Sequence, residues 1–317
     1  MAGANLPAKM YKKKNPTQLR LEFEGQGNIT QYIDIAMALS AINRKFIRQG
    51  VYFYVNSVEC YNNSDAVVDL HVAPDTWVTR NAWKRGFGIF QKMNALVDTP
   101  RPKYHDFKIY LTNLHRQTGS MNPVLFGVNS DSEEVTVDEW EYSKFVSGDD
   151  DGDATREADD FNVHLIGPHV NSIGGATDNG DWHSIGLIKS YSETRPEPDQ
   201  SGAPILPAGH AIDPLLNIFD MSSEEMLNDI AINLDTLNDR TPYNADLYNG
   251  EQVDHMQHVA RLATSVSSGR VAKAAGFCAP FGLICVDPDE LQSAEDKYRI
   301  VLNLAAGTYH GCYAERV

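Results

Sequence analysis

The sequence lacks the features that would place it in several common classes of protein. It has no apolar run near the roughly 20 residues that a membrane-spanning helix needs. Its 23 glycines and 15 prolines are ordinary for 317 residues, which excludes collagen-like and low-complexity proteins. Apolar residues make up 42% of the chain, so a sizeable core can form and global disorder is excluded. The basic start MAGANLPAKMYKKKNP has no apolar segment behind it, so we expect no secretory signal.

Cysteine is scarce, and its spacing gives no metal-binding or redox motif. The four cysteines, Cys60, Cys278, Cys285 and Cys312, form no CxxC pair. Two of them lie in the apolar stretch AAGFCAPFGLICV, where a free thiol behaves as a small hydrophobic group. We therefore expect all four to be reduced core residues of a protein made in a reducing cytoplasm.

Positive charge is also scarce, and it gathers near the N-terminus. The 27 Lys and Arg residues against 43 Asp and Glu residues give a formal net charge of −16. Residues 1–20 sum to +5 with no acid, which leaves −21 for the rest of the chain. Residues 131–160 alone hold thirteen acids and only two bases, a net charge of −11. A body this acidic repels phosphate, so non-specific binding of nucleic acid by its main surface is not expected.

The N-terminal arm is the one segment suited to an anionic partner. Its lysines are Lys9, Lys12, Lys13 and Lys14. Such an arm can contact lipid headgroups or nucleic acid. The alternative is a solubilising, poorly ordered terminus, and the sequence leaves both open.

Alternating apolar and polar residues predict strands along most of the chain. Period-two patterns bounded by Gly, Asn, Asp and Pro are typical of half-buried strands. The predicted strand segments are 19–23, 29–42, 51–61, 68–72, 107–111, 135–140, 161–165, 185–187, 277–286 and 300–304. The segment 29–42 is also rich enough in alanine to form a helix.

Two segments have helical periodicity instead. In residues 76–97 large apolar side chains recur near helical spacing, and Asp75 or Thr76 is suited to be the N-cap. Residues 222–238 begin with a Ser-x-x-Glu capping box and repeat apolar residues on one face.

Strands and helices do not alternate one by one, which disfavours a parallel α/β sheet and favours a β-sandwich or barrel. The acidic stretch SGDDDGDATREADD at 147–160 is the best candidate for a linker. The expected organisation is therefore a basic arm at 1–16, a first barrel at 17–148, an acidic linker at 149–160 and a second barrel at 161–317.

Enzyme and metal motifs are missing. The chain has no GxGxxG, P-loop, HExxH or GxSxG motif. His164 and His169 flank a Gly-Pro pair, and His255 and His258 are three apart, but neither pair has a third ligand. Residues 147–158 resemble a calcium loop, yet Ser and Ala occupy its first and twelfth positions. We expect no catalytic, cofactor or metal site, and histidines that are exposed or hydrogen-bonded.

Aromatic and proline-rich features leave two alternatives open. The tryptophans Trp77, Trp83, Trp140 and Trp182 could stack on bases, but packing in the core and between subunits is the better interpretation with acids nearby. Residues 194–214 hold five prolines, which predict an extended loop over a neighbouring barrel or subunit, or an ordinary surface loop.

The whole-chain pattern resembles the capsid proteins of small icosahedral viruses with circular single-stranded DNA genomes. The resemblance lies in the lysine arm AKMYKKKNP before the first strand, the segment TWVTRNAWKRGF, FNVHLIGPH followed by WHSIGLIKSYSETR, and the closing strand GTYHGCYAERV. It covers most of the chain but includes no signature motif. It implies an all-β fold with a few helices: a jelly-roll sandwich of two antiparallel four-stranded sheets that self-assembles into a closed shell. Such a protein needs no catalysis, so the resemblance implies that this chain is not an enzyme.

The short arm and acidic body differ from the Arg-rich arms of many capsid proteins that bind DNA directly. They look more like the major capsid proteins of single-stranded DNA bacteriophages with an internal membrane. This likeness implies a double jelly roll whose trimers form pseudo-hexagonal capsomers in the virion shell, after synthesis in the host cytoplasm. It also implies contacts with a vertex protein, and an arm that meets the internal lipid membrane or the genome.

Other classes of protein share this sandwich architecture. Within the capsid class, the alternative is a single jelly roll with long insertions that contacts single-stranded DNA directly. Outside it, a non-viral carbohydrate-binding or enzymatic β-sandwich would use the same fold.

Overall fold

The structure is a computed structural model, and the fold is built from the residues that it describes. These are 17–62, 65–95, 104–126, 132–135, 140–146, 160–171, 182–194, 243, 247–267, 269–289, 291 and 296–317. The chain divides into a larger unit, Met1–Tyr191 with Asn249–Val317, and a smaller one, Ser192–Tyr248. The helix predicted at 222–238 lies outside the described residues, so the fold below is that of the larger unit.

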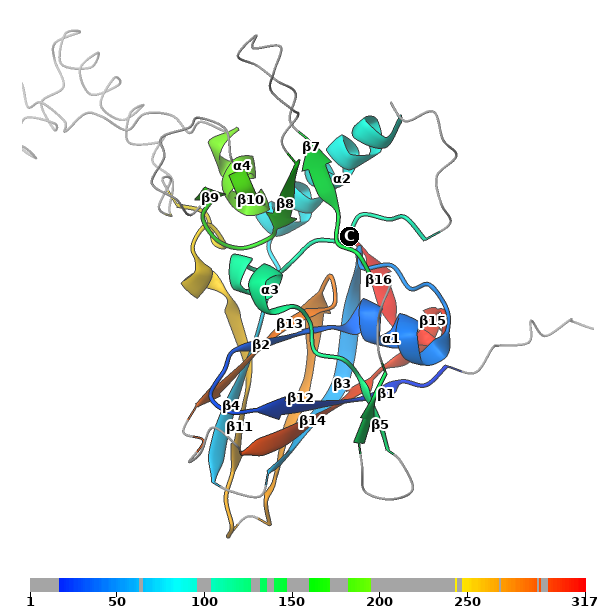
Figure 1. Cartoon of the computed structure of the whole chain (residues 1–317), viewed down its shortest axis with the longest axis vertical. Helices are drawn as coiled ribbons and strands as arrows, with labels where there is room; N and C mark the ends of the chain where they lie inside the picture. The colour runs from blue at the N-terminus through cyan, green and yellow to red at the C-terminus, as the bar shows by residue number, and fades with distance from the viewer. Residues whose placement is uncertain are drawn as a thin grey trace, which may run out of the picture. The chain divides into compact units, whose positions relative to one another are not determined.

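Two antiparallel sheets form a β-sandwich (Figure 1). The first has the order β1-β14-β3-β12, and β16 pairs with the start of β3. Its strands are β1 (Arg20–Gln26), β3 (Val51–Asn62), β12 (Val271–Pro280), β14 (Lys297–Leu304) and β16 (Ala314–Arg316). The second has the order β11-β4-β13-β2. Its strands are β2 (Gln31–Asp34), β4 (Ala66–Val72), β11 (Gln257–Thr264) and β13 (Leu283–Asp289).

Alternation along the strands places one face of each sheet in a shared core. Leu21 of β1 and Ile300 of β14 are fully buried from the first sheet, and Val68 and Leu70 of β4 from the second. All four belong to a single hydrophobic cluster that both sheets supply. Burying a side chain of this size contributes about 1.5–3 kcal/mol, so this face holds the sandwich together.

The pairing of the eight main strands is nested from the ends of the chain inward. The first pairs with the last, β1 with β14, and Arg20 lies opposite Asn303. The second pairs with the seventh (β2 with β13), the third with the sixth (β3 with β12), and the fourth with the fifth (β4 with β11). Every one of these pairs is antiparallel.

This pairing corrects the expected division into barrels at 17–148 and 161–317. Strands from both ranges alternate within each sheet, so together they make one sandwich. The expected linker does not separate barrels either, because Val146 and Asp160 are opposite each other in neighbouring strands of one small sheet. Periodicity predicts where a strand is but carries no information on its partner, which is why the two ranges looked like successive barrels.

The insertion between β4 and β11 carries most of the remaining elements. Most of its described part lies at one end of the sandwich, whereas the segment at Pro123 runs back beside Phe23 of β1 (Figure 1). Its helices are α2 (Trp77–Ala95), α3 (Asn113–Thr118) and α4 (Leu187–Glu193), with a 3-10 turn at Val253–His255. Its strands are β5 (Val124–Phe126), β6 (Ser132–Glu134), β7 (Lys144–Val146), β8 (Asp160–His164), β9 (Val170–Asn171) and β10 (Trp182–Gly186). The last four form a small sheet in the order β7-β8-β10-β9, with β8 and β10 parallel.

Three predicted strands differ from the structure. The segment 29–42, predicted as a strand or a helix, contains one after the other. Strand β2 runs directly into helix α1 (Ile35–Asn43), with Asp34 as the N-cap of the helix. The segment 277–286 is parts of β12 and β13, joined by a turn at Phe281 and Gly282, both with positive φ. The segment 107–111 is irregular apart from one bridge at Tyr110, although its apolar side chains are buried.

Of the other predicted elements, one helix is confirmed and one strand is only partly described. The helix predicted at 76–97 is confirmed as α2, and Thr76 accepts a hydrogen bond from the backbone N–H of Thr79 at 3.3 Å, as an N-cap does. Of the strand expected at 135–140, residues 136–139 lie outside the described ranges, and the nearest described strand, β6, ends before it at Glu134. Beyond β14, a short strand β15 (Ala306–Tyr309) precedes β16.

Candidate functional site

The lysine arm lies outside the described residues. Lys9, Lys12, Lys13 and Lys14 all belong to the range 1–16, so its expected contact with lipid or DNA stays a prediction. The same is true of the calcium-like loop, because residues 147–159 are also outside the described ranges.

His164 and His169 each make hydrogen bonds within the fold. His164 is fully buried, with Nδ1 2.6 Å from Ser184 Oγ and Nε2 3.0 Å from the carbonyl of Pro168. Burial lowers the pKa of His164 to about 4, so the ring is neutral. His169 Nδ1 accepts a hydrogen bond from the N–H of Gly186 at 3.1 Å. These contacts fit the expected hydrogen-bonded histidines.

The pair at 255 and 258 is divided between two elements. His255 ends the 3-10 turn, whereas His258 lies on β11, where its Nε2 is 3.2 Å from Asp69 Oδ1. The ring of His71 on β4 lies 5.2 Å from that of His258. Within the described ranges, no group of three or more His, Cys, Asp or Glu side chains is arranged to hold a metal ion.

A buried polar network joins the sandwich to the insertion. Asp34 and Gln49 are both fully buried at the end of the sandwich. Gln49 donates to Asp34 Oδ2 at 3.0 Å, accepts from the backbone N–H of Ile109 at 2.7 Å, and donates to the carbonyl of Ile109 at 2.9 Å. The amide of Gln49 therefore holds both backbone groups of Ile109, while the next residue, Tyr110, is held by backbone hydrogen bonds to Val163 and Leu165.

A second branch of this network reaches the insertion through Tyr142. Its hydroxyl donates to Asp34 Oδ2 at 3.2 Å and is 2.7 Å from Ser120 Oγ, which is 2.6 Å from His115 Nε2. Burial raises the pKa of Asp34 to about 6, against the lowering effect of its hydrogen bonds. Burial also lowers the pKa of His115 to about 3, so this ring is neutral.

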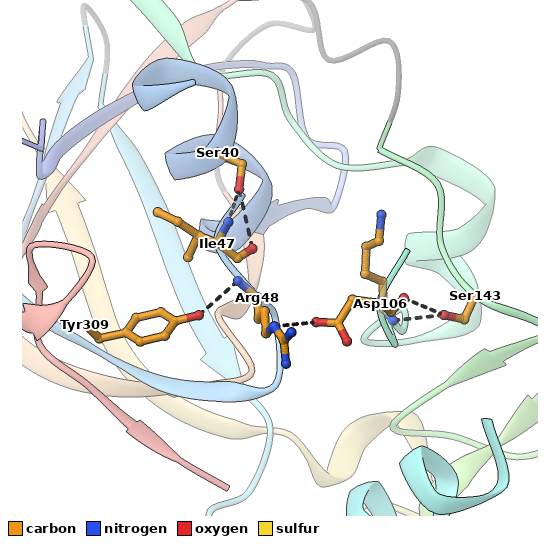
Figure 2. A network of polar contacts seen from close by, with 7 residues as sticks. Ser40, Ile47, Arg48, Asp106, Ser143 and Tyr309 are labelled. Carbon is orange, nitrogen blue, oxygen red and sulfur yellow. Dashed lines mark hydrogen bonds and ion pairs between the residues drawn. The ribbon is translucent and has the colours of Figure 1, made fainter. Parts of the chain in front are cut away.

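A third set of contacts ties the chain near α1 to the insertion and to the C-terminal hairpin (Figure 2). The backbone N–H of Arg48 donates to the Tyr309 hydroxyl at 3.1 Å, and Arg48 Nε lies 3.5 Å from Asp106 Oδ2. Ser143 Oγ donates to the carbonyl of Asp106 at 3.2 Å. Together with the buried network, these contacts fix the insertion against the sandwich and give it a defined position from which to present its surface.

An aromatic cluster fills the space beneath α2. Phe107 lies at its centre, with ring-centre distances of 5.7 Å to Trp83, 5.4 Å to Phe90 and 5.9 Å to Phe145. Trp83 also stacks on Phe281, in the turn between β12 and β13, at 5.7 Å. Such pairs contribute about 0.5–1.5 kcal/mol each beyond their buried area, so the apolar side of α2 is firmly occupied.

The opposite side of α2 is basic. The helix contains no acid, and its four cations, Arg80, Lys84, Arg85 and Lys92, are all exposed. Arg80 is paired with Asp75, at 2.8 Å just before the helix. We call the side that carries Lys84, Arg85 and Lys92 the basic face of α2. It is unusual in a chain whose net charge is −16.

The first sheet of the sandwich, in contrast, balances its own charges. Glu24 is 2.8 Å from Lys297 and 3.4 Å from Arg299, and Glu59 is 2.9 Å from Lys273. Exposed pairs of this kind contribute only about 0–1 kcal/mol each. Their effect is to leave this sheet nearly neutral, so the basic face of α2 stands out among the described surfaces.

The cysteines agree largely with the sequence prediction. Cys60, Cys285 and Cys312 are free and buried, whereas Cys278 is free and partly exposed. Burial raises the pKa of Cys60 and of Cys285 to about 12, which keeps both thiols protonated. Among the tryptophans, Trp83 is a core residue as expected, while Trp77 is 52% exposed.

Comparison with known proteins gave no relative: no family model, no curated protein and no solved structure matches this chain. In the part of the chain that the structure describes, no helix is long and apolar enough to cross a membrane. The function proposed below therefore rests on the strand order and the surfaces of this chain alone.

Proposed function

We propose that this chain is the major capsid protein of a small icosahedral virus, built on a single jelly roll with a long insertion. The nested antiparallel pairing carries this proposal. A ribbon of four strand pairs that folds over on itself gives the sheet orders β1-β14-β3-β12 and β11-β4-β13-β2. That is the arrangement of a jelly roll, a fold used by capsid proteins, lectins and cupins.

A single jelly roll changes what is expected of the assembly. The double jelly roll and its trimeric, pseudo-hexagonal capsomer both depended on two successive barrels in one chain. With one sandwich per chain, a shell is assembled from copies that each contribute one jelly roll. The proposal therefore keeps self-assembly into a virion shell and favours the single-barrel alternative.

The architecture suits a shell-forming protein for two reasons. Closing strands into a sandwich protects most of their edges, so copies meet through loops and insertions and not through uncontrolled strand pairing. The long insertion is fixed to the sandwich by the buried network around Asp34 and Gln49. An insertion held in this way can form repeatable contacts between copies, as a closed shell requires.

The proposed role of the lysine arm is still contact with an anionic partner. Residues 1–20, the arm with Arg20, carry +5 and would neutralise only about five phosphates per copy, which is little for condensing a genome. Contact with anionic lipid headgroups, at about 1 kcal/mol per lysine, is the second use of the same charge. A virion with or without an internal membrane distinguishes these two partners.

The test is to purify the recombinant chain and measure its mass by light scattering over a range of concentrations, with electron microscopy of the same samples. Shells, or oligomers of fixed size, are the expected result. A monomer at every concentration whose melting temperature rises with a sugar would instead support a carbohydrate-binding sandwich. Turnover of a substrate without any assembly would support an enzyme.

A further inference from the structure

The basic face of α2 carries cations that the described surroundings leave unneutralised. Lys84, Arg85 and Lys92 are exposed, and no ion pair involves them within the described ranges. Lys92 follows the other two by eight and seven residues, which places all three on one side of the helix within about 12 Å. Arg80, one turn earlier, already has its partner in Asp75.

This face is suited to a protein partner more than to a membrane. The apolar side of α2 is buried on the aromatic cluster, so the helix has no free apolar side to insert among lipid chains. Ile89, which is 47% exposed, lies between Arg85 and Lys92 along the chain, at the border between the basic face and the buried side of α2. An exposed apolar side chain next to a charged face is a composition found in contacts between proteins.

The charge of the chain identifies the partner. Residues 77–95 carry +4, so the rest of the chain carries −20, and 131–160 alone account for −11. A second copy therefore offers strongly acidic surface to this helix. We propose that the basic face of α2 docks on an acidic surface of a second copy of this chain. This inference rests on the proposed self-assembly and names one of its contacts.

Such a contact explains how highly anionic copies can associate at all. Two molecules of charge −16 repel each other on average, so association needs a place where opposite charges meet. A basic helix on one copy and an acidic surface on the next make a head-to-tail contact, which can close into a ring or shell. Because exposed charges are screened by salt, this contact weakens as ionic strength rises.

The first experiment reverses the face with the triple variant K84E/R85E/K92E. A matched control, R44E/R270E/R316E, makes the same change in net charge at three exposed arginines elsewhere. Sedimentation equilibrium of wild type and both variants measures association, and circular dichroism checks that each variant is folded. We expect about tenfold weaker association for the α2 variant, and near wild-type association for the control.

The second experiment identifies the occupant. A mixture of unlabelled and ¹⁵N-labelled wild-type protein is treated with a carbodiimide, which joins lysine amines to carboxylates in contact. Cross-linked peptides that combine one labelled and one unlabelled partner at Lys84 or Lys92 support the proposal. Links only within one copy, or none at these lysines, overturn it.

The remaining outcomes separate this inference from the proposed function. If wild type and the α2 variant assemble equally, the proposed docking of the basic face is wrong, whereas the proposed capsid function is not contradicted. A wild type that stays monomeric at every salt concentration would refute both. An α2 variant that loses binding to a single-stranded DNA oligonucleotide but associates normally would assign the face to nucleic acid, against the proposal.

Discussion

Asp34 is where three parts of the chain converge. Its side chain caps α1 by accepting from the backbone N–H of Met37, and it also accepts from Gln49 and Tyr142. Nothing in the local sequence distinguishes this aspartate from the other acids, because its partners lie far along the chain. The sequence alone therefore could not predict the network, and its predicted segment 29–42 did not place the end of a strand at Asp34.

The pH dependence of stability should report on this carboxyl group. Burial raises its pKa to about 6 in the folded state, above the value of about 4 expected when unfolded. The folded state thus binds the proton more tightly, and this stabilisation is lost as the pH rises from about 4 through 6. We expect wild type to lose about 2 kcal/mol more than Asp34→Asn over that interval. Urea denaturation of both proteins at pH 4 to 8 measures it, and parallel curves would contradict the assignment.

A substitution at Gln49 tests how the segment around Ile109 is held. Gln49→Ala leaves the buried N–H and carbonyl of Ile109 without partners, at a cost of about 1–3 kcal/mol. We expect faster hydrogen exchange at residues 104–112 and a lower free energy of unfolding. Gln257→Ala, at an exposed position on β11, is the matched control and should change neither. Unchanged exchange near Ile109 in the Gln49 variant would show that the amide does not hold this segment.

Among the elements, α2 shows what pattern can and cannot predict. Its helical spacing, its N-cap and its four cations are all visible in the sequence, and the structure confirms the helix. Which side is buried depends on Phe107, Phe145 and Phe281, which come from distant segments. The segment around Phe107 even alternates like a strand, because burial of every second side chain needs no strand partner.

Two glycines in α2 provide a test of this packing. A Cβ at Gly86 would lie 2.9 Å from Leu187 Cδ1 and 3.2 Å from Phe107 Cζ, whereas one at Gly88 would meet nothing within 4 Å. Alanine has a helix propensity about 1 kcal/mol better than glycine, so Gly88→Ala should stabilise the protein by up to that amount. Gly86→Ala should lose this gain to overpacking, which costs about 1–3 kcal/mol. Thermal unfolding of both variants compares them, and equal stabilisation would mean that α2 is not packed as described.

At the scale of the whole molecule, the order of strands in space is the feature that the sequence did not reveal. All-β composition and the position of most strands follow from period-two patterns, which local side-chain burial imposes. Partners are set by contacts between distant segments. A division at 149–160 was therefore expected, although Val146 and Asp160 pair with each other in one small sheet.

Expression of separate halves tests this single sandwich. Residues 161–317 contain β11 to β14, whose partners β1 to β4 lie before residue 148. We expect this fragment alone to be unfolded by circular dichroism, and co-expression with residues 1–160 to restore a folded complex. A fragment 161–317 that folds cooperatively by itself would restore the two-barrel interpretation.

The pairing of β1 with β14 also has a consequence for synthesis. Arg20 lies opposite Asn303, so the pairing between β1 and β14 cannot form until residue 303 has left the ribosome. Proteins of such high contact order fold slowly, and their unpaired strands stay exposed to aggregation in the meantime. During synthesis, β1 therefore stays without its partner until β14 has been translated.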